Sequence, residues 1–390
     1  MIKIYLGIIL FITTISNSFT QTVTDSIINQ GVTRIFHYHI PSDYNGIDEI
    51  PMVVVLHGGN SNGMNFMDNS YFDEIGDTVS YISVFPTAYL GQWTDGRGNT
   101  QADSLGIDDI IFLSDMIDTL ATEYSIDTCK LYLTGISNGG MMTHRFACEK
   151  PEKFQGYASI AASIPTYYYP NCSPNLPVNM MMIHGTEDNF SPYEGGTSGI
   201  PSSTGTVTGI DSTINFWNNN NSCINADSPD SIVYADINLM DNSYVVSYDY
   251  SPCTDNGEVK LYKVYGGGHT LPGGPGPIQI PIIGYSNKDI NGAYEIWKFF
   301  SNKSCQTTTS LSEIENENEV SIYPNPSQNT ITIKSDLNVE KVIVYDLLGK
   351  IVGIFNSSSI NLMDFSSGVY LMEIEFLESS ISTKRLIQKL

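Results

Sequence analysis

The residues most able to carry chemistry begin with Gly-Ile-Ser-Asn-Gly at residues 135–139. This G-x-S-x-G pattern is typical of a sharp turn between a buried strand and a helix, which raises a serine hydroxyl above the end of a sheet. A hydroxyl held in this way can attack a carbonyl carbon once a base removes its proton. Taken alone the pattern is weak, because a glycine-rich turn without a catalytic role has the same letters. Ser137 is therefore a candidate nucleophile whose partners must come from elsewhere in the chain.

A nucleophilic serine needs a base, and the base needs an acid that orients it. In the chain order serine, acid, histidine, the second and third groups follow later strands. Asp188 ends the segment His-Gly-Thr-Glu-Asp after one strand-like run, and His269 follows three glycines after another. We predict Asp188 as the orienting acid and His269 as the base, with Glu187 as a minor alternative to Asp188.

Backbone N–H groups must also stabilise the negative oxygen that forms during acyl transfer. The segment His-Gly-Gly at residues 57–59 follows an early apolar strand, so its N–H groups can face that oxygen. We expect the amide of Gly59, together with the amide of Asn138 directly after the serine. The residues predicted to contact the substrate are His57, Trp93 and Leu271.

The other four histidines are interpreted as structural. His37 and His39 alternate along an early strand. His144 lies inside the helix that follows the serine, and His184 ends a strand ahead of the acid. Three adjacent methionines at residues 180–182 are interpreted as strand filler rather than a metal site. None of the cysteines has the spacing of zinc ligands, and the predicted chemistry requires neither a metal nor an organic cofactor.

The elements that must position these residues alternate strand-like apolar runs with segments of helical period. Buried strands are predicted at residues 51–56, 130–134, 178–184 and 259–264, and helices at residues 107–124, 209–217 and 293–300. Alternation of this kind over residues 22–305 indicates βα units and a mostly parallel, doubly wound sheet. We expect Ser137, Asp188 and His269 to converge at one rim of that sheet.

The same motifs resemble those of a known family, the secreted α/β-hydrolases called polyhydroxybutyrate depolymerase-like or feruloyl esterase-like. The motifs that carry the resemblance lie at residues 56–59, 93–98, 108–113, 135–142, 184–188 and 267–269. The likeness covers roughly residues 33–300, and it implies the α/β-hydrolase fold with Ser137 as nucleophile, Asp188 as orienting acid and His269 as base. The family often has Trp-Pro-Gly after its catalytic histidine, whereas Leu271 stands here in place of that aromatic residue.

The beginning of the chain predicts an export signal. A short basic start precedes an apolar run at residues 4–12 that is too short to span a bilayer. Ser-Phe-Thr at residues 18–20 fits the small residues of a cleavage site. We interpret residues 1–20 as a signal peptide and residues 21–305 as the catalytic domain. No later stretch is long enough to cross a membrane, so no integral membrane segment is expected after cleavage.

The C-terminal part has a different composition. Residues 306–319 form a polar, acidic linker, and residues 320–390 alternate short strand-like runs with turns, which predicts a small all-β sandwich. The segments at residues 323–326, 344–349 and 368–371 resemble the type A sorting domain of the type IX secretion system. The resemblance implies outer-membrane export to the outside of the cell or its surface. A carbohydrate-binding β-sandwich is the alternative, although no cluster of exposed aromatic residues favours it.

All six cysteines lie in the predicted catalytic domain, and an even number suits an exported protein. Two disulfides are expected, joining Cys223 to Cys253 and Cys148 to Cys172. On the lower side of the sheet a third pair can meet, Cys129 and Cys305. Six cysteines allow many pairings, so each of these is a hypothesis.

The charge of the chain limits its partners. It has 18 Lys and Arg against 42 Asp and Glu, a formal charge of −24. Such a field repels nucleic acids, anionic lipid and polyanionic polysaccharides, and it favours a neutral substrate. The sequence thus predicts an exported serine esterase acting through an acyl-enzyme, on a polyhydroxyalkanoate or on feruloyl or acetyl groups of plant polysaccharide. The alternatives are a serine peptidase of the same fold and a non-catalytic surface protein that binds a polymer.

Overall fold

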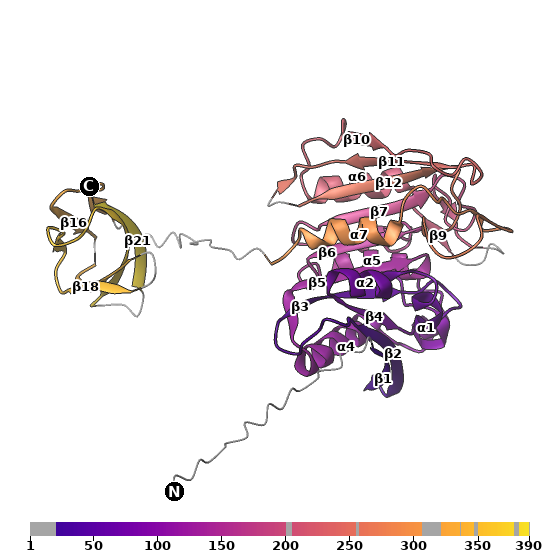
Figure 1. Ribbon diagram of the computed structural model, residues 1–390, viewed down its shortest axis with the longest axis horizontal. Coiled ribbons are helices and arrows are strands. Elements are labelled where there is room, and N and C mark those ends of the chain that lie inside the picture. Colours follow the sequence, from indigo (N-terminus) through magenta and orange to yellow (C-terminus); the bar gives the residue numbers. More distant parts are fainter. Residues whose placement is uncertain are drawn as a thin grey trace, which may run out of the picture. The chain divides into compact units, whose positions relative to one another are not determined.

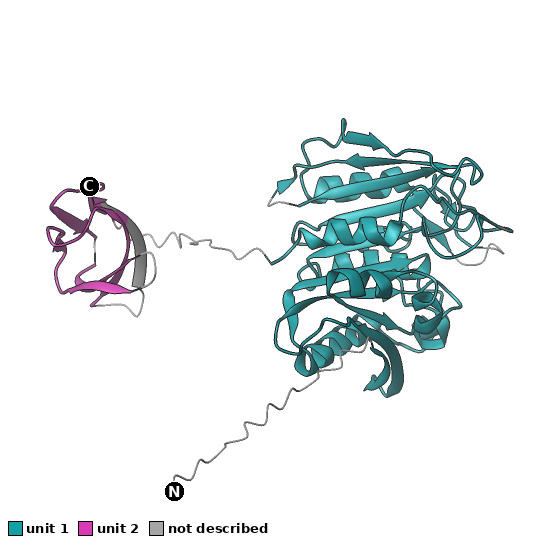
Figure 2. Ribbon diagram, in the orientation of Figure 1, with its two compact units in different colours: residues 1–305 teal, residues 306–390 magenta. Residues whose placement is uncertain are grey.

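The computed structural model describes residues 21–199, 205–254, 257–305, 321–335, 337–346, 350–377 and 382–389. The predicted signal peptide and the predicted linker lie outside these residues. The chain divides into two compact units, residues 1–305 and 306–390 (Figure 2). Each unit has its own sheets and its own buried core.

A ten-stranded sheet runs through the first unit in the order β1-β2-β4-β3-β5-β6-β7-β12-β11-β10 (Figure 1). Its strands are β1 (Gln21–Asn29), β2 (Val32–Ile40), β3 (Ile50–Leu56), β4 (Ile82–Pro86), β5 (Ile126–Ile136), β6 (Gly156–Ile160), β7 (Met180–Gly185), β10 (Asp230–Val233), β11 (Tyr244–Asp249) and β12 (Val259–Tyr265). The six central strands from β4 to β12 pair in parallel, and the strands on both sides of them pair antiparallel. The carboxyl ends of the central strands therefore meet at one edge.

Helices cover both faces of this sheet (Figure 1). They are α1 (Gly63–Met67), α2 (Phe72–Val79), α3 (Gln101–Ser104), α4 (Asp109–Glu123), α5 (Asn138–Glu149), α6 (Ile210–Asn220) and α7 (Gly292–Ser301), with short 3₁₀ turns at Tyr89–Gly91 and Tyr169–Asn171. Helices α4, α5 and α6 pack into one apolar core, and α1, α2 and α7 pack into a second core on the opposite face. Two cores around a parallel sheet, with a serine between β5 and α5, make the α/β-hydrolase fold that the motifs predicted.

Element boundaries differ from the sequence prediction by a few residues at most places. The predicted helix at residues 107–124 starts later, because the side chain of Asp108 caps it by accepting the Ile110 N–H at 3.1 Å. Strand β5 begins well before residue 130. Its start, Ile-Asp-Thr-Cys, contains adjacent polar residues, and only Ile126 of the four pairs with β3 before the register shifts, so a search for continuous apolar runs did not include it.

Two short pairs of strands lie outside the large sheet. They are β8 (Gly196–Thr197) with β9 (Thr206–Val207), and β13 (Gln279–Ile280) with β14 (Gly284–Tyr285). Both pairs belong to the loops beyond β7 and β12. They give local structure to the segments that follow the predicted acid and the predicted base.

Three disulfides join the six cysteines of the first unit. They pair Cys129 with Cys305, Cys148 with Cys172, and Cys223 with Cys253, which are the pairings considered from the sequence. The first closes the longest loop, a sequence separation of 176. Among the described helices, none has both the length and the apolar character that crossing a bilayer requires.

The second unit is the small β-sandwich that the sequence predicted. One sheet contains β15 (Ser321–Tyr323), β16 (Thr330–Lys334) and β19 (Ser359–Asn361). The other contains β17 (Val339–Tyr345), β18 (Ile351–Phe355), β20 (Gly368–Phe376) and β21 (Ser382–Lys389). All the pairs are antiparallel, and apolar residues from both sheets form one core.

Candidate active site

Ser137 sits in a strained turn between β5 and α5. Its φ of 57° and ψ of −122° are rare for any residue with a side chain, and its N–H donates to Ile160 O at 2.9 Å. The turn needs glycine on both sides. A Cβ on Gly135 would lie 2.5 Å from the Gly139 oxygen, and one on Gly139 would lie 2.5 Å from the His57 oxygen. Strand β5 and helix α5 can approach this closely only because positions 135 and 139 carry no side chain. The sharp turn between them leaves the Ser137 hydroxyl facing outward.

His269 and Asp188 are bonded to each other at the carboxyl ends of β12 and β7. The His269 Nδ1–H donates to Asp188 Oδ2 at 2.8 Å, while Asp188 Oδ1 accepts the N–H groups of Phe190 and Ser191, both at 2.8 Å. Burial alone would raise the pKa of the Asp188 carboxyl. The imidazole of His269, together with His184 and the Ser191 N–H, outweighs the effect of burial, so the pKa lies below its usual value. Asp188 is thus an ionised acceptor that fixes the His269 ring.

Glu187 and His184, the other two titratable residues of the motif His-Gly-Thr-Glu-Asp, have different surroundings. Glu187 is exposed, and only its backbone is held, by an N–H to Gly267 O hydrogen bond of 2.9 Å. His184 is buried, with Nε2 donating to Ser191 O at 2.7 Å and lying 3.5 Å from Asp188 Oδ2. Burial lowers the pKa of His184, which keeps its ring neutral. Asp188, rather than Glu187, is the carboxylate that contacts the predicted base.

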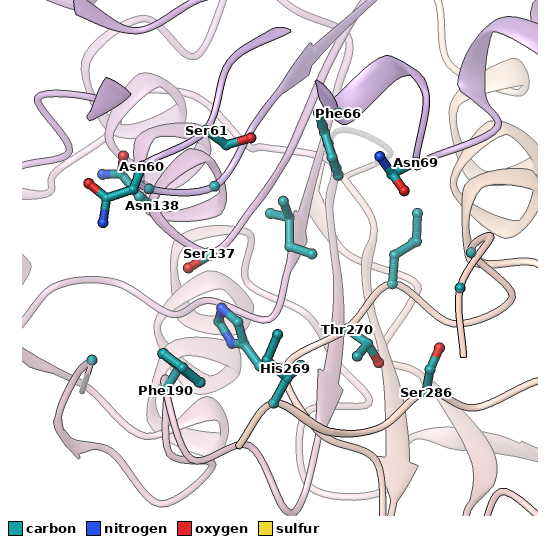
Figure 3. Close-up of a pocket in the computed structure, with 18 of the residues that line it drawn as sticks. Asn60, Ser61, Phe66, Asn69, Ser137, Asn138, Phe190, His269, Thr270 and Ser286 are labelled. Carbon is teal, nitrogen blue, oxygen red and sulfur yellow. The ribbon is translucent and has the colours of Figure 1, made fainter. Parts of the chain in front are cut away.

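Ser137 and His269 line one cavity of about 510 Å³ at this edge of the sheet. Figure 3 shows both side chains among the others that line the cavity. The lining residues that sequence reasoning missed include Asn60, Phe66, Asn69, Met141 and Phe190. Asn60, Met141 and Phe190 lie close in sequence to predicted site residues, whereas Phe66 and Asn69 belong to α1 and the turn after it, which no predicted motif included. The Phe190 ring lies 5.1 Å from the His269 ring, between centroids.

Gly59 and Asn138 also line the cavity. Asn138 is the first residue of α5, so its backbone N–H has no acceptor within the helix. The polar atoms of the Asn138 side chain are hydrogen-bonded to Trp93 and Asp95 instead. The two residues expected to supply the oxyanion amides therefore both line the cavity that contains Ser137.

His57 and Trp93 are not among the lining residues, and both are fully buried. His57 Nε2 accepts the Ala88 N–H at 3.0 Å, so its Nδ1–H donates to Gly58 O at 2.6 Å. Burial lowers the pKa of His57 to about 4. Trp93 Nε1–H donates to His57 O at 2.9 Å. The expectation of substrate contact is wrong for these two residues, because their rings are buried and pack against each other. Leu271, the third residue expected to contact the substrate, does line the cavity.

The remaining histidines make structural contacts away from the cavity. His37 and His39 pair with threonines of β1, at 2.8 and 3.2 Å from Nδ1. His144 is buried in α5 and its Nδ1 accepts the Trp217 Nε1–H at 3.3 Å. Within the described ranges, no group of three or more His, Cys, Asp and Glu residues could hold a metal ion.

The arrangement provides the parts of an acyl-transfer site. One imidazole nitrogen of His269 is held by a carboxylate, which leaves the other free to accept a proton. A hydroxyl lies on the same cavity, next to backbone donors that can stabilise a negative oxygen.

Known proteins resemble both units. Residues 321–389 match the family model of the secretion system C-terminal sorting domain. Such a domain directs its chain to the outside of the cell or to the cell surface, so this protein is an exported one.

Three curated relatives match the first unit. The bifunctional acetylxylan esterase/xylanase XynS20E of Neocallimastix patriciarum is 24% identical over 64% of this chain and 33% of its own length. NocK of Nocardia uniformis subsp. tsuyamanensis, whose name describes it as an esterase, is 25% identical over 70% of this chain and 80% of its own length. Poly(3-hydroxyalkanoate) depolymerase C of Paucimonas lemoignei is 29% identical over 34% of this chain and 32% of its own length. The alignment spans about a third of the first and third of these relatives.

Proposed function

We propose that the first unit is a carboxylic ester hydrolase with Ser137 as its nucleophile. The observation that carries this proposal is that Ser137 and the Asp188-bound imidazole of His269 line one cavity, together with Gly59 and Asn138. The esterase names of the relatives support the same class of reaction.

The first half of the reaction forms an acyl-enzyme. His269 Nε2 takes the proton of the Ser137 hydroxyl as Oγ attacks the ester carbonyl carbon. The carbonyl oxygen becomes negative and accepts hydrogen bonds from the amides of Gly59 and Asn138. Asp188 stabilises the charged imidazole. The ester C–O bond then breaks, and the leaving alcohol receives the proton from His269.

The second half returns the enzyme to its starting state. A water molecule gives a proton to His269 and attacks the acyl carbon, and the same amides stabilise the second negative oxygen. The bond to Ser137 Oγ breaks, the serine takes back a proton, and a carboxylic acid leaves.

The cavity suits a neutral ester. Its one lining arginine, Arg97, is bonded to the buried carboxylate of Asp95, and the lining side chains of Phe66 and Leu271 are apolar. Two of the relatives are named for acetylated xylan and for poly(3-hydroxyalkanoate), and both are uncharged polymers rich in esters. We propose acetyl, feruloyl or hydroxyalkanoyl esters of such polymers as the substrate class.

The test is the Ser137→Ala variant assayed with p-nitrophenyl acetate and butyrate. Release of p-nitrophenol should fall to the uncatalysed rate, and a fluorophosphonate probe should label the natural chain but not the variant. Unchanged hydrolysis by the variant would refute the proposal. Cleavage of casein in place of esters would indicate a peptidase, and a natural chain that no fluorophosphonate labels would indicate a polymer-binding protein without catalysis.

The partner proposed for the second unit is the outer-membrane machinery of type IX secretion. The sorting-domain match supports an export role, and deleting residues 306–390 should leave the protein inside the cells of a host that has this system. A truncated chain that still reaches the medium would contradict this partner.

A further inference from the structure

The side chain of Asn138 is hydrogen-bonded at both of its polar atoms, although Asn138 is one of the residues that line the cavity. Its Oδ1 accepts the Trp93 N–H at 2.8 Å. Its Nδ2 donates to Trp93 O at 3.1 Å and to Asp95 Oδ2 at 2.6 Å. Asn138 is only 3% exposed, so no water competes for these bonds. The first residue of α5 is therefore fixed in place by a segment that lies more than forty positions earlier.

Asp95 connects this contact to the wall of the cavity. Its carboxylate is fully buried, and Arg97 binds it through Nε at 2.9 Å and Nη2 at 2.7 Å to Oδ2. A buried carboxylate is stable only when it is paired and hydrogen-bonded, and here Arg97 and Asn138 together meet that need. Arg97 itself lines the cavity.

The same segment also contacts the strand end that precedes Gly59. Trp93 Nε1–H donates to His57 O, and His57 donates in turn to Gly58 O, directly before Gly59. Trp93 therefore contacts both the strand end that leads to Gly59 and the side chain of Asn138. The residues before and at the two expected amides are thus both contacted by residues 93–95.

We propose that Asp95 is a positioning residue for the oxyanion site: by holding the side chain of Asn138 it aims the Asn138 N–H at the negative oxygen. This inference rests on the esterase activity proposed above. The oxyanion exists only while the tetrahedral intermediate forms and breaks. A misplaced Asn138 N–H should therefore slow the chemical steps and leave substrate binding unchanged.

The primary test is Asp95→Asn, which keeps the shape of the side chain and removes its charge. We expect kcat for p-nitrophenyl acetate to fall by at least about tenfold, since losing an oxyanion donor outright costs on the order of 10²–10³. KM should change by less than about twofold. The inhibition constant of a trifluoromethyl ketone, which forms a tetrahedral oxyanion on the serine, should rise by the same factor as kcat falls.

The matched control is Asp109→Asn. Asp109 is also fully buried, bonded to an arginine (Arg34, 2.6 Å) and bonded to the same segment through the Thr94 N–H at 2.8 Å. Its bonds do not reach Asn138. Its loss should lower the melting temperature while kcat and the inhibition constant stay within about twofold of the natural values. Equal losses of kcat in both variants would show a general structural role for Asp95 and overturn the proposal.

A second variant, Asn138→Ala, removes the other half of the contact and keeps the backbone amide. It should lower kcat as Asp95→Asn does, and the double variant should lose little more than either single variant, because both act through one contact. Additive losses, or an unchanged kcat in Asn138→Ala, would reject the inference even where Asp95→Asn fails to fold. If Ser137→Ala were to retain activity, the proposed function itself would fail, which is a separate result.

Discussion

Asp188 and His269 stand 81 positions apart in the chain, yet a hydrogen bond of 2.8 Å joins Asp188 Oδ2 to His269 Nδ1. The other carboxylate oxygen of Asp188 is held by two backbone amides of the turn that follows β7. The orientation of the imidazole is therefore set by the backbone of a neighbouring strand end.

Asp188→Asn should lower kcat for short-chain esters by about 10³–10⁴-fold, because an amide at this position no longer favours the Nδ1–H form of His269. Steady-state kinetics with p-nitrophenyl butyrate measures the change. Glu187→Gln is the matched control, since Glu187 is adjacent and exposed, and its kcat should stay within about twofold. The roles would be reversed if Glu187→Gln caused the larger loss.

The free energy of unfolding of the first unit should decrease as the pH falls from about 7 to 5. Burial lowers the pKa of His57 to about 4 and of His144 to about 3, and it lowers that of His184. Below about pH 6.5 these histidines become protonated in the unfolded chain but stay neutral in the folded chain. The unfolded state is therefore favoured as the pH falls, and the stability that is fully present above this pH is lost. Each histidine adds up to about 1.4 kcal/mol per pH unit.

Denaturant titrations at several pH values, followed by tryptophan fluorescence, measure this slope, because all three tryptophans lie in the first unit. His144→Leu should reduce the slope by about one proton's contribution. A free energy of unfolding that stays constant between pH 7 and 5 would contradict the neutral, buried state of these rings.

Removing the disulfide that closes the longest loop should destabilise the first unit most. Replacing Cys129 and Cys305 by serine opens a loop with a separation of 176, and the expected cost is about 5 kcal/mol. The same change at Cys148 and Cys172, with a separation of 24, should cost about 3 kcal/mol. Urea unfolding of the two double variants gives both values. A larger loss for the shorter loop would show that strain or packing, and not chain entropy, dominates.

Leu271→Ala should widen the cavity beside His269 and shift the preference toward longer acyl chains. Leu271 is nearly buried and lines the cavity, so truncating it leaves space for several carbon atoms. The ratio of kcat/KM for p-nitrophenyl octanoate to that for the acetate should rise several-fold. Ile282→Ala is the control, because Ile282 is 67% exposed and does not line the cavity. An equal shift in both variants would mean that loop mobility, rather than cavity size, sets the preference.

Much of this molecule could be predicted from local patterns. The alternating elements, the glycine-flanked serine and the β-sandwich of the second unit follow from periodicity and turn chemistry, which neighbouring residues determine. The same reasoning was wrong for Trp93 and His57. An aromatic ring near a site in sequence suggests contact with a ligand, but packing placed these two rings against each other under the cavity. Phe66 and Phe190 line the cavity and carried no signal, because no fixed spacing connects them to Ser137.

The sequence by itself determined where a serine can stand out from a strand end, because only Gly135 and Gly139 allow the backbones to approach so closely. It also limited the acid to one of two adjacent carboxylates. Only the tertiary structure showed that Asp188, and not Glu187, bonds to His269, and only it showed that Asn138 is held by Asp95. The physical reason is that steric rules act between neighbours along the chain, whereas burial and hydrogen-bond partners depend on which distant segments the fold packs together.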